Sequence, residues 1–504
     1  MNKKLLRCLL ISFILALLFI LFSCTNDTQE TKENQKNIDV TDSNGGDSVT
    51  EPETTIEFNY YENIPEGVDF DGYTFTILTW EETPWMAADT LSYAEETVGE
   101  ILQDTAYKRN LEIKELLNIE IAPIYREHDQ IYNQVRRDNA AGDCTYDIVA
   151  PFGGITYENN KLIVGNQYYD WKKVPYVDLG ADWYNHGANE SFTILGKQFS
   201  CVSDYFNYGR QSSYMVLFNK ELFTDYGLEY PYQIAYDGKW TYDALCTYIK
   251  GAYRDVNGDG KRDDGDFYGL STSPFCFSAA IINWGELPLK VDDSGFVLNI
   301  FNQKIADMVD RLTDLTQSPD VLFPEGIYYN NFFEGRSLFT IYASNPNLLR
   351  AVEVDFGYLP YPKYDEAQPD YIGLSDGNMM GIPNSRTEEE ISRTGAVIEA
   401  ISAASNKYMI NAFVKNYFEN KILRDEDSIN MFYIARRGIV YSMGRVYDTT
   451  DLINASFNYY TEIFNSAVSG SESGSVNLAS QYEKNADKLQ IALDKVYEKM
   501  LNNN

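Results

Sequence analysis

The alternation of apolar and polar positions predicts a mixed α/β chain from residue 57 onward. The stretch "FDGYTFTILTW", residues 70 to 80, alternates like a half-buried strand and ends at Trp80. Next, "VGEILQDTAYKRNLEIKELLNIEIAPIY" reads as a helix and a short strand, and "DQIYNQVRRDNAAGDCTYDIVAP" repeats that order. Strands that alternate with helices at these intervals indicate a parallel sheet covered by helices.

The later part of the chain predicts more strands and then a helical end. "SYMVLFNKELFTDYGL" is a strand running into a helix, "SLFTIYAS" and "DFGYLPYP" are further strands, and "NMMGIP" (378–383) is a short one. From Glu388 to the end helical spacing dominates, with a polar break at "SGSESGSV". The length exceeds one ordinary core, so we expect two lobes.

The first 23 residues are predicted to be a lipoprotein signal peptide. Lys3, Lys4 and Arg7 precede an apolar run that has the length of a signal-peptide core and is short for a membrane span. The following "LFSC" resembles the bacterial lipobox, so Cys24 would carry lipid chains such as palmitate and become the first mature residue. We therefore expect an extracytoplasmic protein that is lipid-anchored to the bacterial cell membrane. The alternative is a plain signal peptide followed by an ordinary cysteine.

Residues 24–56 are predicted to be a disordered tether. They are rich in Thr, Asn, Asp, Glu and Gly, and they contain no aromatic residue; the first one after them is Phe58. Such a segment buries too little apolar surface to offset the entropy of ordering it. We exclude it from the fold.

Charge and motifs narrow the function classes. The chain has 41 basic and 75 acidic residues, a net charge of −34, which argues against nucleic-acid binding because phosphate contacts rest on Lys and Arg. There are only two histidines, and no HExxH, GxSxG, P-loop or GxGxxG pattern occurs in the sequence. Four cysteines lie beyond the lipobox without a CxxC spacing, which indicates neither a zinc site nor a dense disulfide framework. They are Cys144, Cys201, Cys246 and Cys276, and their pairing stays open.

One stretch, "DVNGDGKRDDGD" (255–266), matches the spacing of a calcium-binding loop. Gly260 stands at the sixth position, where the loop turns sharply, and Asp266 replaces the usual Glu at the twelfth. Thr241 is a predicted N-cap of the preceding helix, and a strand follows, so the expected calcium is a structural brace and not a sensor. An uncoordinated acidic turn is the alternative. The expected metal ligands are Asp255, Asn257, Asp259, Lys261 through its carbonyl, Asp263 and Asp266.

Several stretches, in this order, resemble bacterial extracellular solute-binding proteins of the carbohydrate type, the lipoprotein components of ABC importers. They are "LQDTAYKRNLEIKELLNIEI", "AGDCTYDIVAP", "LFNKELFTDYGLEYPY", "DGKWTYDAL", "DVNGDGKRDDGDFYGL", "FFEGRSLFTIY", "DFGYLPYPKYDEAQPDY" and "NMMGIP", and they span about 70 to 383. None of them is a catalytic signature.

The resemblance implies an α/β, two-lobed, periplasmic-binding-protein-like (type II) fold with hinge crossovers and a helical C-terminal part. The first crossover would fall near Phe206–Tyr214 and the returning one near Leu374–Ile382. Lobe 1 would comprise residues 57–205 plus 375–420, and lobe 2 residues 206–374 plus 421–504.

Sugar rings stack on aromatic side chains, and their hydroxyls bond to carboxylates and amides, so we expect ligand contacts of these types beyond the strand ends and near the hinges. For Trp80 and Trp284, core packing is an equal alternative. Tyr342 follows "LFTI", where the resemblance implies an aromatic or polar ligand contact. The predicted ligand-binding residues are Trp80, Glu81, Phe152, Asp204, Tyr205, Tyr208, Trp284, Tyr342, Asp376 and Asn378.

The sequence thus favours a protein that is not an enzyme. It would capture a carbohydrate, expected to be an oligosaccharide, and deliver it to the permease subunits of an ABC importer. Two alternatives from other classes stay open. An exported glycan-acting hydrolase would need two carboxylates across a cleft, and a calcium-braced adhesive or scaffold lipoprotein would need no closed pocket. Peptides and other organic solutes are further possible cargoes.

Overall fold

The computed structural model describes residues 59–81, 91–127, 130–151, 157–207, 214–292, 295–324, 326–343, 349, 352–375, 378–414, 426–442, 454–469 and 478–502. The chain divides into two units, Met1–Phe58 and Asn59–Asn504, and all described residues belong to the second. The predicted signal peptide, Cys24 and the tether lie outside the described residues. Among the residues that were searched, no helix has the length and apolar character needed to cross a membrane.

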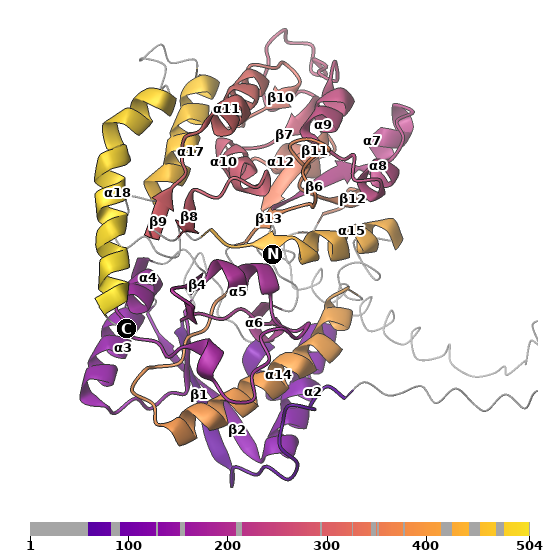
Figure 1. The fold of residues 1–504 in the computed structure, drawn as a ribbon. Helices are drawn as coiled ribbons and strands as arrows, with labels where there is room; N and C mark the ends of the chain where they lie inside the picture. The colour runs from indigo at the N-terminus through magenta and orange to yellow at the C-terminus, as the bar shows by residue number, and fades with distance from the viewer. Residues whose placement is uncertain are drawn as a thin grey trace, which may run out of the picture. The chain divides into compact units, whose positions relative to one another are not determined.

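A parallel three-stranded sheet forms from the first part of the chain, in the order β2-β1-β3. Figure 1 labels β1 and β2, with α2 and α14 beside them. β1 (Tyr73–Trp80) pairs along its whole length with β2 (Ile119–Arg126) and near its end with β3 (Ile148–Ala150). An isolated bridge from Val149 to Gly381 adds a late segment of the chain to this edge. The predicted strand, helix, strand order is confirmed here.

Helices cover both faces of this sheet because the side chains of β1 alternate between them. Phe75 and Ile77 share a buried cluster with α2 (Ile101–Leu117) and α14 (Glu388–Val414). Leu78 and Trp80 share another cluster with α3 (Ile131–Ala141) and α4 (Tyr157–Val164). The result is a helix–sheet–helix layering.

A second, five-stranded sheet is mixed, in the order β10-β7-β11-β6-β12. Its strands are β10 (Val321–Leu322), β7 (Tyr268–Ser271), β11 (Ser337–Ala343), β6 (Tyr214–Asn219) and β12 (Phe356–Pro360). β6 runs antiparallel to both of its neighbours, whereas β10, β7 and β11 are parallel. One large cluster buries this sheet against α9 (Tyr242–Ile249), α10 (Pro274–Asn283) and α11 (Gln303–Thr316).

The remaining elements are short or lie late in the chain. They are η1 (Leu91–Tyr93), η2 (Trp171–Lys173), α5 (His186–Ser191), β4 (Thr193–Ile194), β5 (Lys197–Gln198), α6 (Asp204–Asn207), α7 (Lys220–Asp225), α8 (Tyr232–Tyr236), β8 (Leu289–Asp292), β9 (Gly295–Leu298), α12 (Asn330–Phe333), β13 (Gly373–Leu374), α15 (Glu426–Arg437), β14 (Ile439–Val440), α17 (Asn454–Ser469) and α18 (Leu478–Asn502).

The chain returns from the second sheet to the first along residues 373–383. β13 pairs in parallel with β14, and the Ser375 amide donates to the Val440 carbonyl at 2.9 Å. Farther along, Met380 exchanges two backbone hydrogen bonds with Cys201, and Gly381 exchanges two with Val149. This returning segment lies where the sequence predicts the second crossover.

The C-terminal helices divide their packing between the two sheets. α17 packs on α10 and α11, beside the second sheet. The buried face of α18 (Leu493, Val496, Met500) shares the cluster of Leu78 and Val149 under the first sheet, together with the β8–β9 hairpin. The sequence analysis assigned residues 421–504 and the β8–β9 hairpin to lobe 2, whereas in the structure α18 and this hairpin share a buried cluster with the first sheet. The lobe boundaries stay a prediction.

Replacement of Gly438 is expected to destabilise the junction between β13 and β14. A Cβ atom at Gly438 would lie 1.7 Å from the Tyr371 carbonyl oxygen, and backbone cannot yield as a side chain does. We predict that Gly438→Ala lowers the free energy of unfolding by about 1–3 kcal/mol or more in urea denaturation. Gly326→Ala is the matched control, since nothing lies within 4 Å of its Cβ position. Equal stability of the two variants would contradict this packing.

Candidate functional site

The residues predicted at the end of β1 differ in accessibility. The Trp80 side chain is buried in the cluster of Leu78 and Tyr441. Glu81 is exposed, and its amide continues the sheet by donating to the Arg126 carbonyl at 2.9 Å. Trp80 is therefore a packing residue in this structure, while the Glu81 carboxylate faces solvent at the carboxyl end of the strand.

Asp204 and Tyr205 lie together on α6, and both are fully buried. The Asp204 carboxylate forms an ion pair with Arg436 of α15, with 2.6 Å between Oδ1 and Nη2, and accepts from Asn406 of α14 at 2.8 Å. The Tyr205 hydroxyl donates to the Ser92 carbonyl, and the Arg109 guanidinium lies 5.0 Å from the Tyr205 ring centre. Asp204 therefore connects α6 and α14, at the first sheet, with α15.

α15 itself packs on the second sheet. It contacts β12 and α8, and Ser428 shares a 2.6 Å hydrogen bond with the Tyr232 hydroxyl. The Asp204–Arg436 pair thus joins elements that pack on different sheets.

Trp284 and Tyr342 lie in the core around the second sheet. The Trp284 indole donates to the Pro362 carbonyl at 3.0 Å and meets the Tyr242 ring edge-on. Tyr342 packs edge-on against Tyr329, with 5.1 Å between ring centres. Both side chains have at most 1% of their surface exposed, so in this structure each is a packing residue.

Four of the predicted ligand-binding residues remain to be described. Phe152, Tyr208 and Asp376 lie outside the described residues, and Asn378 is half-buried in the returning segment. The predicted set is spread over three buried clusters: Trp80 in one, Tyr205 in the second, Trp284 and Tyr342 in the third. Their role as ligand contacts stays a prediction.

Phe275 is a candidate ligand contact that the sequence analysis missed. It lies shortly after the end of β7 at Ser271, at the second position of α10. Its surface is 41% exposed, and the centre of its ring lies 6.0 Å from that of Tyr214. Ser273 caps α10 and Pro274 opens it. The sequence "SPF" signals such a helix start, which would have placed Phe275 beyond a strand end, where ligands of α/β sheets bind.

The predicted calcium loop adopts a chain of tight turns. Asp255 accepts from the amides of Gly258 at 2.6 Å and Gly260 at 3.0 Å. Asn257 and Asp259 each accept from the amide two residues onward, at 2.9 and 2.8 Å. Gly260 has φ of +74°, the left-handed conformation that the sharp turn requires.

The loop is anchored between α9 and β7. Thr241 caps α9 as predicted, accepting from the Ala244 amide at 3.3 Å, and Arg254 exchanges two 3.0 Å backbone bonds with Phe267. Asp266 is fully buried and accepts from the Val256 amide and from the Tyr253 hydroxyl. Burial, followed by the hydrogen bond to Asp266, raises the pKa of Tyr253, so its hydroxyl stays a donor at neutral pH.

The loop fits a calcium ion in donor chemistry. All of its side-chain candidates offer oxygen, which calcium prefers, and Asp266 supplies a buried carboxylate at the twelfth position. Within the described ranges, however, no three His, Cys, Asp or Glu side chains are grouped so that they could hold a metal ion. The carboxylates are directed to the loop's own amides in this structure.

Asp204→Asn tests whether this carboxylate stabilises the fold. Removal of its charge leaves the Arg436 guanidinium, 13% exposed, without its ion-pair partner, and we predict a loss of about 3 kcal/mol in the free energy of unfolding. Glu120→Gln is the matched control, because its pair with Lys114 lies at the surface and should change stability by less than about 1 kcal/mol. Unchanged stability of Asp204→Asn with lost ligand binding would instead support the sugar-contact prediction.

Comparisons with known proteins identify the fold of this chain. No protein-family model and no curated protein sequence matches the chain. A sugar transporter from Rhizobium etli, in an open conformation, superposes with a TM-score of 0.57 at 13% identity, over 82% of this chain and 98% of that one. A cyclo/maltodextrin-binding protein complexed with maltotetraose gives 0.54 at 13% identity, over 84% and 99%.

An ABC substrate-binding protein from Listeria monocytogenes, in complex with cycloalternan, is similar as well. It has a TM-score of 0.52 at 15% identity, over 83% of this chain and 99% of that one. At such identities the likeness shows the fold. The predicted fold class is confirmed: the chain has the two-lobed, periplasmic-binding-protein-like α/β fold of these substrate-binding proteins, with a helical C-terminal part.

Proposed function

We propose that this protein captures a carbohydrate outside the cytoplasm and delivers it to an ABC importer, without catalysing a reaction. The observation that carries the proposal is the fold, which over more than four-fifths of the chain resembles proteins whose structures hold maltotetraose and cycloalternan. In this proposal Cys24 carries the lipid anchor, the permease subunits are the protein partners, and the cargo is an oligosaccharide.

Aromatic side chains supply the chemistry of capture. The chain has 40 Tyr, 27 Phe and 6 Trp, and flat apolar rings suit the C–H faces of sugars. Phe275 is one exposed ring of this kind, beyond the carboxyl end of β7. A ligand that contacts both lobes would favour the closed arrangement by its preference for that state. The segment 373–383, hydrogen bonded to both β14 and β3, is where such a movement would be hinged.

The calcium loop would act as a brace in this proposal. A bound calcium ion would be held by Asp255, Asn257, Asp259, Asp263, Asp266 and the Lys261 carbonyl, and it would neutralise the clustered carboxylates. Because Arg254 and Phe267 already tie the loop ends together, the ion would stabilise the connection from α9 to β7. Phe275 stands farther along the chain, after β7, so sugar selectivity should not depend on the ion.

Calcium is expected to raise the melting temperature of the protein, and a chelator to reverse the effect. Binding to the folded state alone at 100 times the dissociation constant adds about 2.7 kcal/mol. Asp259→Asn should weaken this response, since the amide keeps the turn to Lys261 but loses the charge. Asp314→Asn, on the exposed face of α11, is the control. A calcium response that is absent, or equal in both variants, would contradict the brace.

Sugar capture is tested by thermal melting against a panel of plant and host oligosaccharides, with calcium present. A saturating ligand should raise the melting temperature by a few degrees, and the glycan should be recovered intact. Phe275→Ala should weaken that ligand's affinity about tenfold through lost apolar contact, while Tyr226→Ala, an exposed ring on the same lobe, should not.

The outcomes separate the function classes. Cleavage of the glycan would indicate the hydrolase alternative, which needs a pair of carboxylates at the cleavage point. No response to any glycan would favour another solute or the scaffold alternative. A shift confined to one glycan family, with intact glycan, supports the transport receptor and identifies its cargo class.

A further inference from the structure

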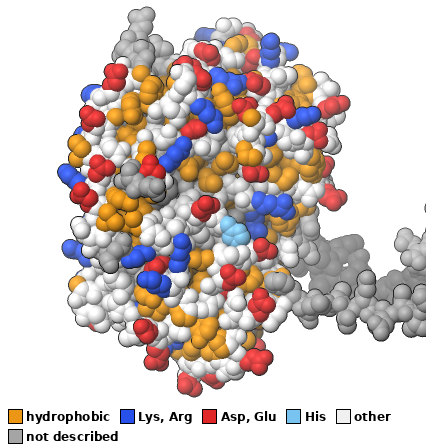
Figure 2. All heavy atoms as spheres, viewed as in Figure 1, with side chains coloured by type: hydrophobic (Ala, Val, Ile, Leu, Met, Phe, Trp, Pro, Cys, Tyr) orange, Lys and Arg blue, Asp and Glu red, His pale blue; other side chains and the backbone are white. Residues whose placement is uncertain are grey.

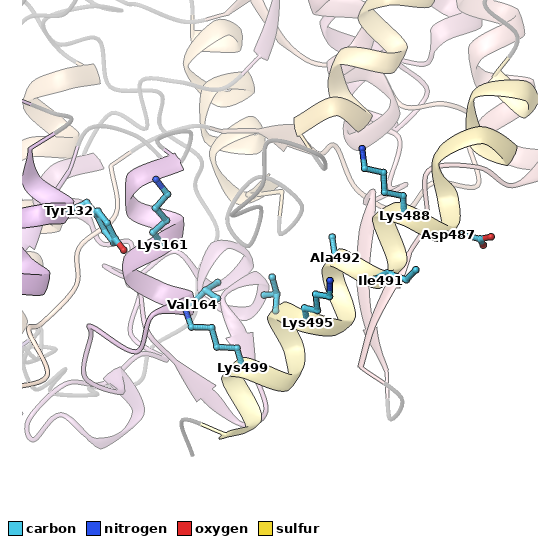
Figure 3. A pocket seen from close by; sticks show the side chains of 10 residues that line it. Tyr132, Lys161, Val164, Asp487, Lys488, Ile491, Ala492, Lys495 and Lys499 are labelled. Carbon is cyan, nitrogen blue, oxygen red and sulfur yellow. The ribbon is translucent and has the colours of Figure 1, made fainter.

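A groove separates α18 from α3 and α4, and none of the predicted ligand-binding residues is among the residues that line it. Its volume is about 740 Å³, within the range of small-molecule sites. Figure 3 shows Tyr132, Lys161 and Val164 on one side and the side chains of α18 on the other. The α18 residues that line it are Asp487, Lys488, Ile491, Ala492, Lys495, Val496 and Lys499.

The floor of the groove is apolar. Val164, Ala492 and Val496 line it, and Ile491 exposes 54% of its surface although it is a large aliphatic residue. Val496 also belongs to the buried cluster beneath, so the floor rests on the core. An exposed apolar surface inside a concave site indicates a ligand with an apolar part.

The rim of the groove is basic, because α18 separates its charges by face. The helix contains four lysines and four acidic residues. Lys488, Lys495 and Lys499 follow the spacing of one face, and Asp487, which points to the other side of the helix in Figure 3, is the one acidic residue in the lining. Lys161 adds a cation from α4, 5.3 Å from the Tyr132 ring centre. Among the described residues, no ion pair involves Lys488, Lys495 or Lys499.

This basic rim contrasts with the rest of a chain whose net charge is −34. In Figure 2 basic, acidic and apolar side chains all lie on the left, where Figure 1 shows α4 and α18; the basic character of the groove comes from its lining, which has four lysines and one aspartate. Two alternative ligands fit less well. A polyanion without apolar parts would make no contact with the exposed Ile491 side chain, and a flat membrane surface would not enter a concave groove. The combination fits one anionic head on an aliphatic chain.

We propose that this groove binds an anionic single-chain amphiphile, a fatty carboxylate or an alkyl phosphate. The aliphatic chain lies along Ile491 and Ala492, over the buried Val164 and Val496, and the anionic head is held by Lys495 and Lys499. Transfer of each methylene group from water is favourable, so a chain of about a dozen carbons supplies most of the affinity and the lysines select the charge of the head.

The test is calorimetric titration of the full-length protein with dodecyl phosphate below its micelle concentration. We expect saturable binding of one equivalent that weakens in high salt. Dodecyltrimethylammonium, which has the same chain and the opposite charge, and butyl phosphate, which has the same head and a short chain, should both bind at least about tenfold more weakly, since each lacks one part of the fit.

Two variants locate the site. Lys495→Glu with Lys499→Glu should weaken dodecyl phosphate about tenfold or more, because attraction becomes repulsion at two exposed positions. Lys484→Glu, on the same helix but outside the groove lining, should leave the affinity unchanged. Equal binding of the cationic amphiphile, equal effects of the two charge reversals, or no binding would overturn the proposal. Sugar-induced melting of the same samples is scored separately, so the proposed sugar function stands or fails independently.

Discussion

Backbone hydrogen bonding along residues 373–383 is the constraint on which the rest of the architecture depends. The described residues of this segment bond first to β14, then to Cys201 and then to Val149 of β3, so the segment connects the second sheet to the first. The pairing requires close approach at Gly381, where a Cβ atom would lie 2.6 Å from the Tyr168 ring, and at Gly438. Glycine is therefore required at two points of close approach along this connection.

Near this segment, polar side chains also connect helices that pack on different sheets. Asp204 bonds to Arg436 and Asn406, and so joins α6, α14 and α15. Such a buried pair contributes specificity of arrangement more than net stability, since burial costs each charge its hydration. It suits a junction that must be positioned reproducibly between elements that pack on different sheets.

The sequence predicted the local elements well because local signals determine them. The alternation in β1, the helical spacing of α2 and the Thr241 cap of α9 are each confined to a few residues. The positions of the candidate site residues were harder to predict, because the burial of a side chain depends on partners that are distant in the sequence. Trp284 and Tyr342 were predicted as ligand contacts, with core packing as an equal alternative for Trp284; in the structure Trp284 bonds to the Pro362 carbonyl and Tyr342 packs on Tyr329, and their role as ligand contacts stays a prediction. Asp204 finds its partner 232 residues away, which no spacing reveals. Phe275 had a readable helix-start signal and was missed.

The measurement that tests the central claim most directly is small-angle X-ray scattering with and without the glycan that stabilises the protein. If the two lobes close on a carbohydrate, the radius of gyration falls when the ligand is added at saturation and returns to its original value after dialysis, with the glycan chemically unchanged. A radius of gyration that stays constant while the glycan is demonstrably bound would contradict a capture mechanism based on lobe closure.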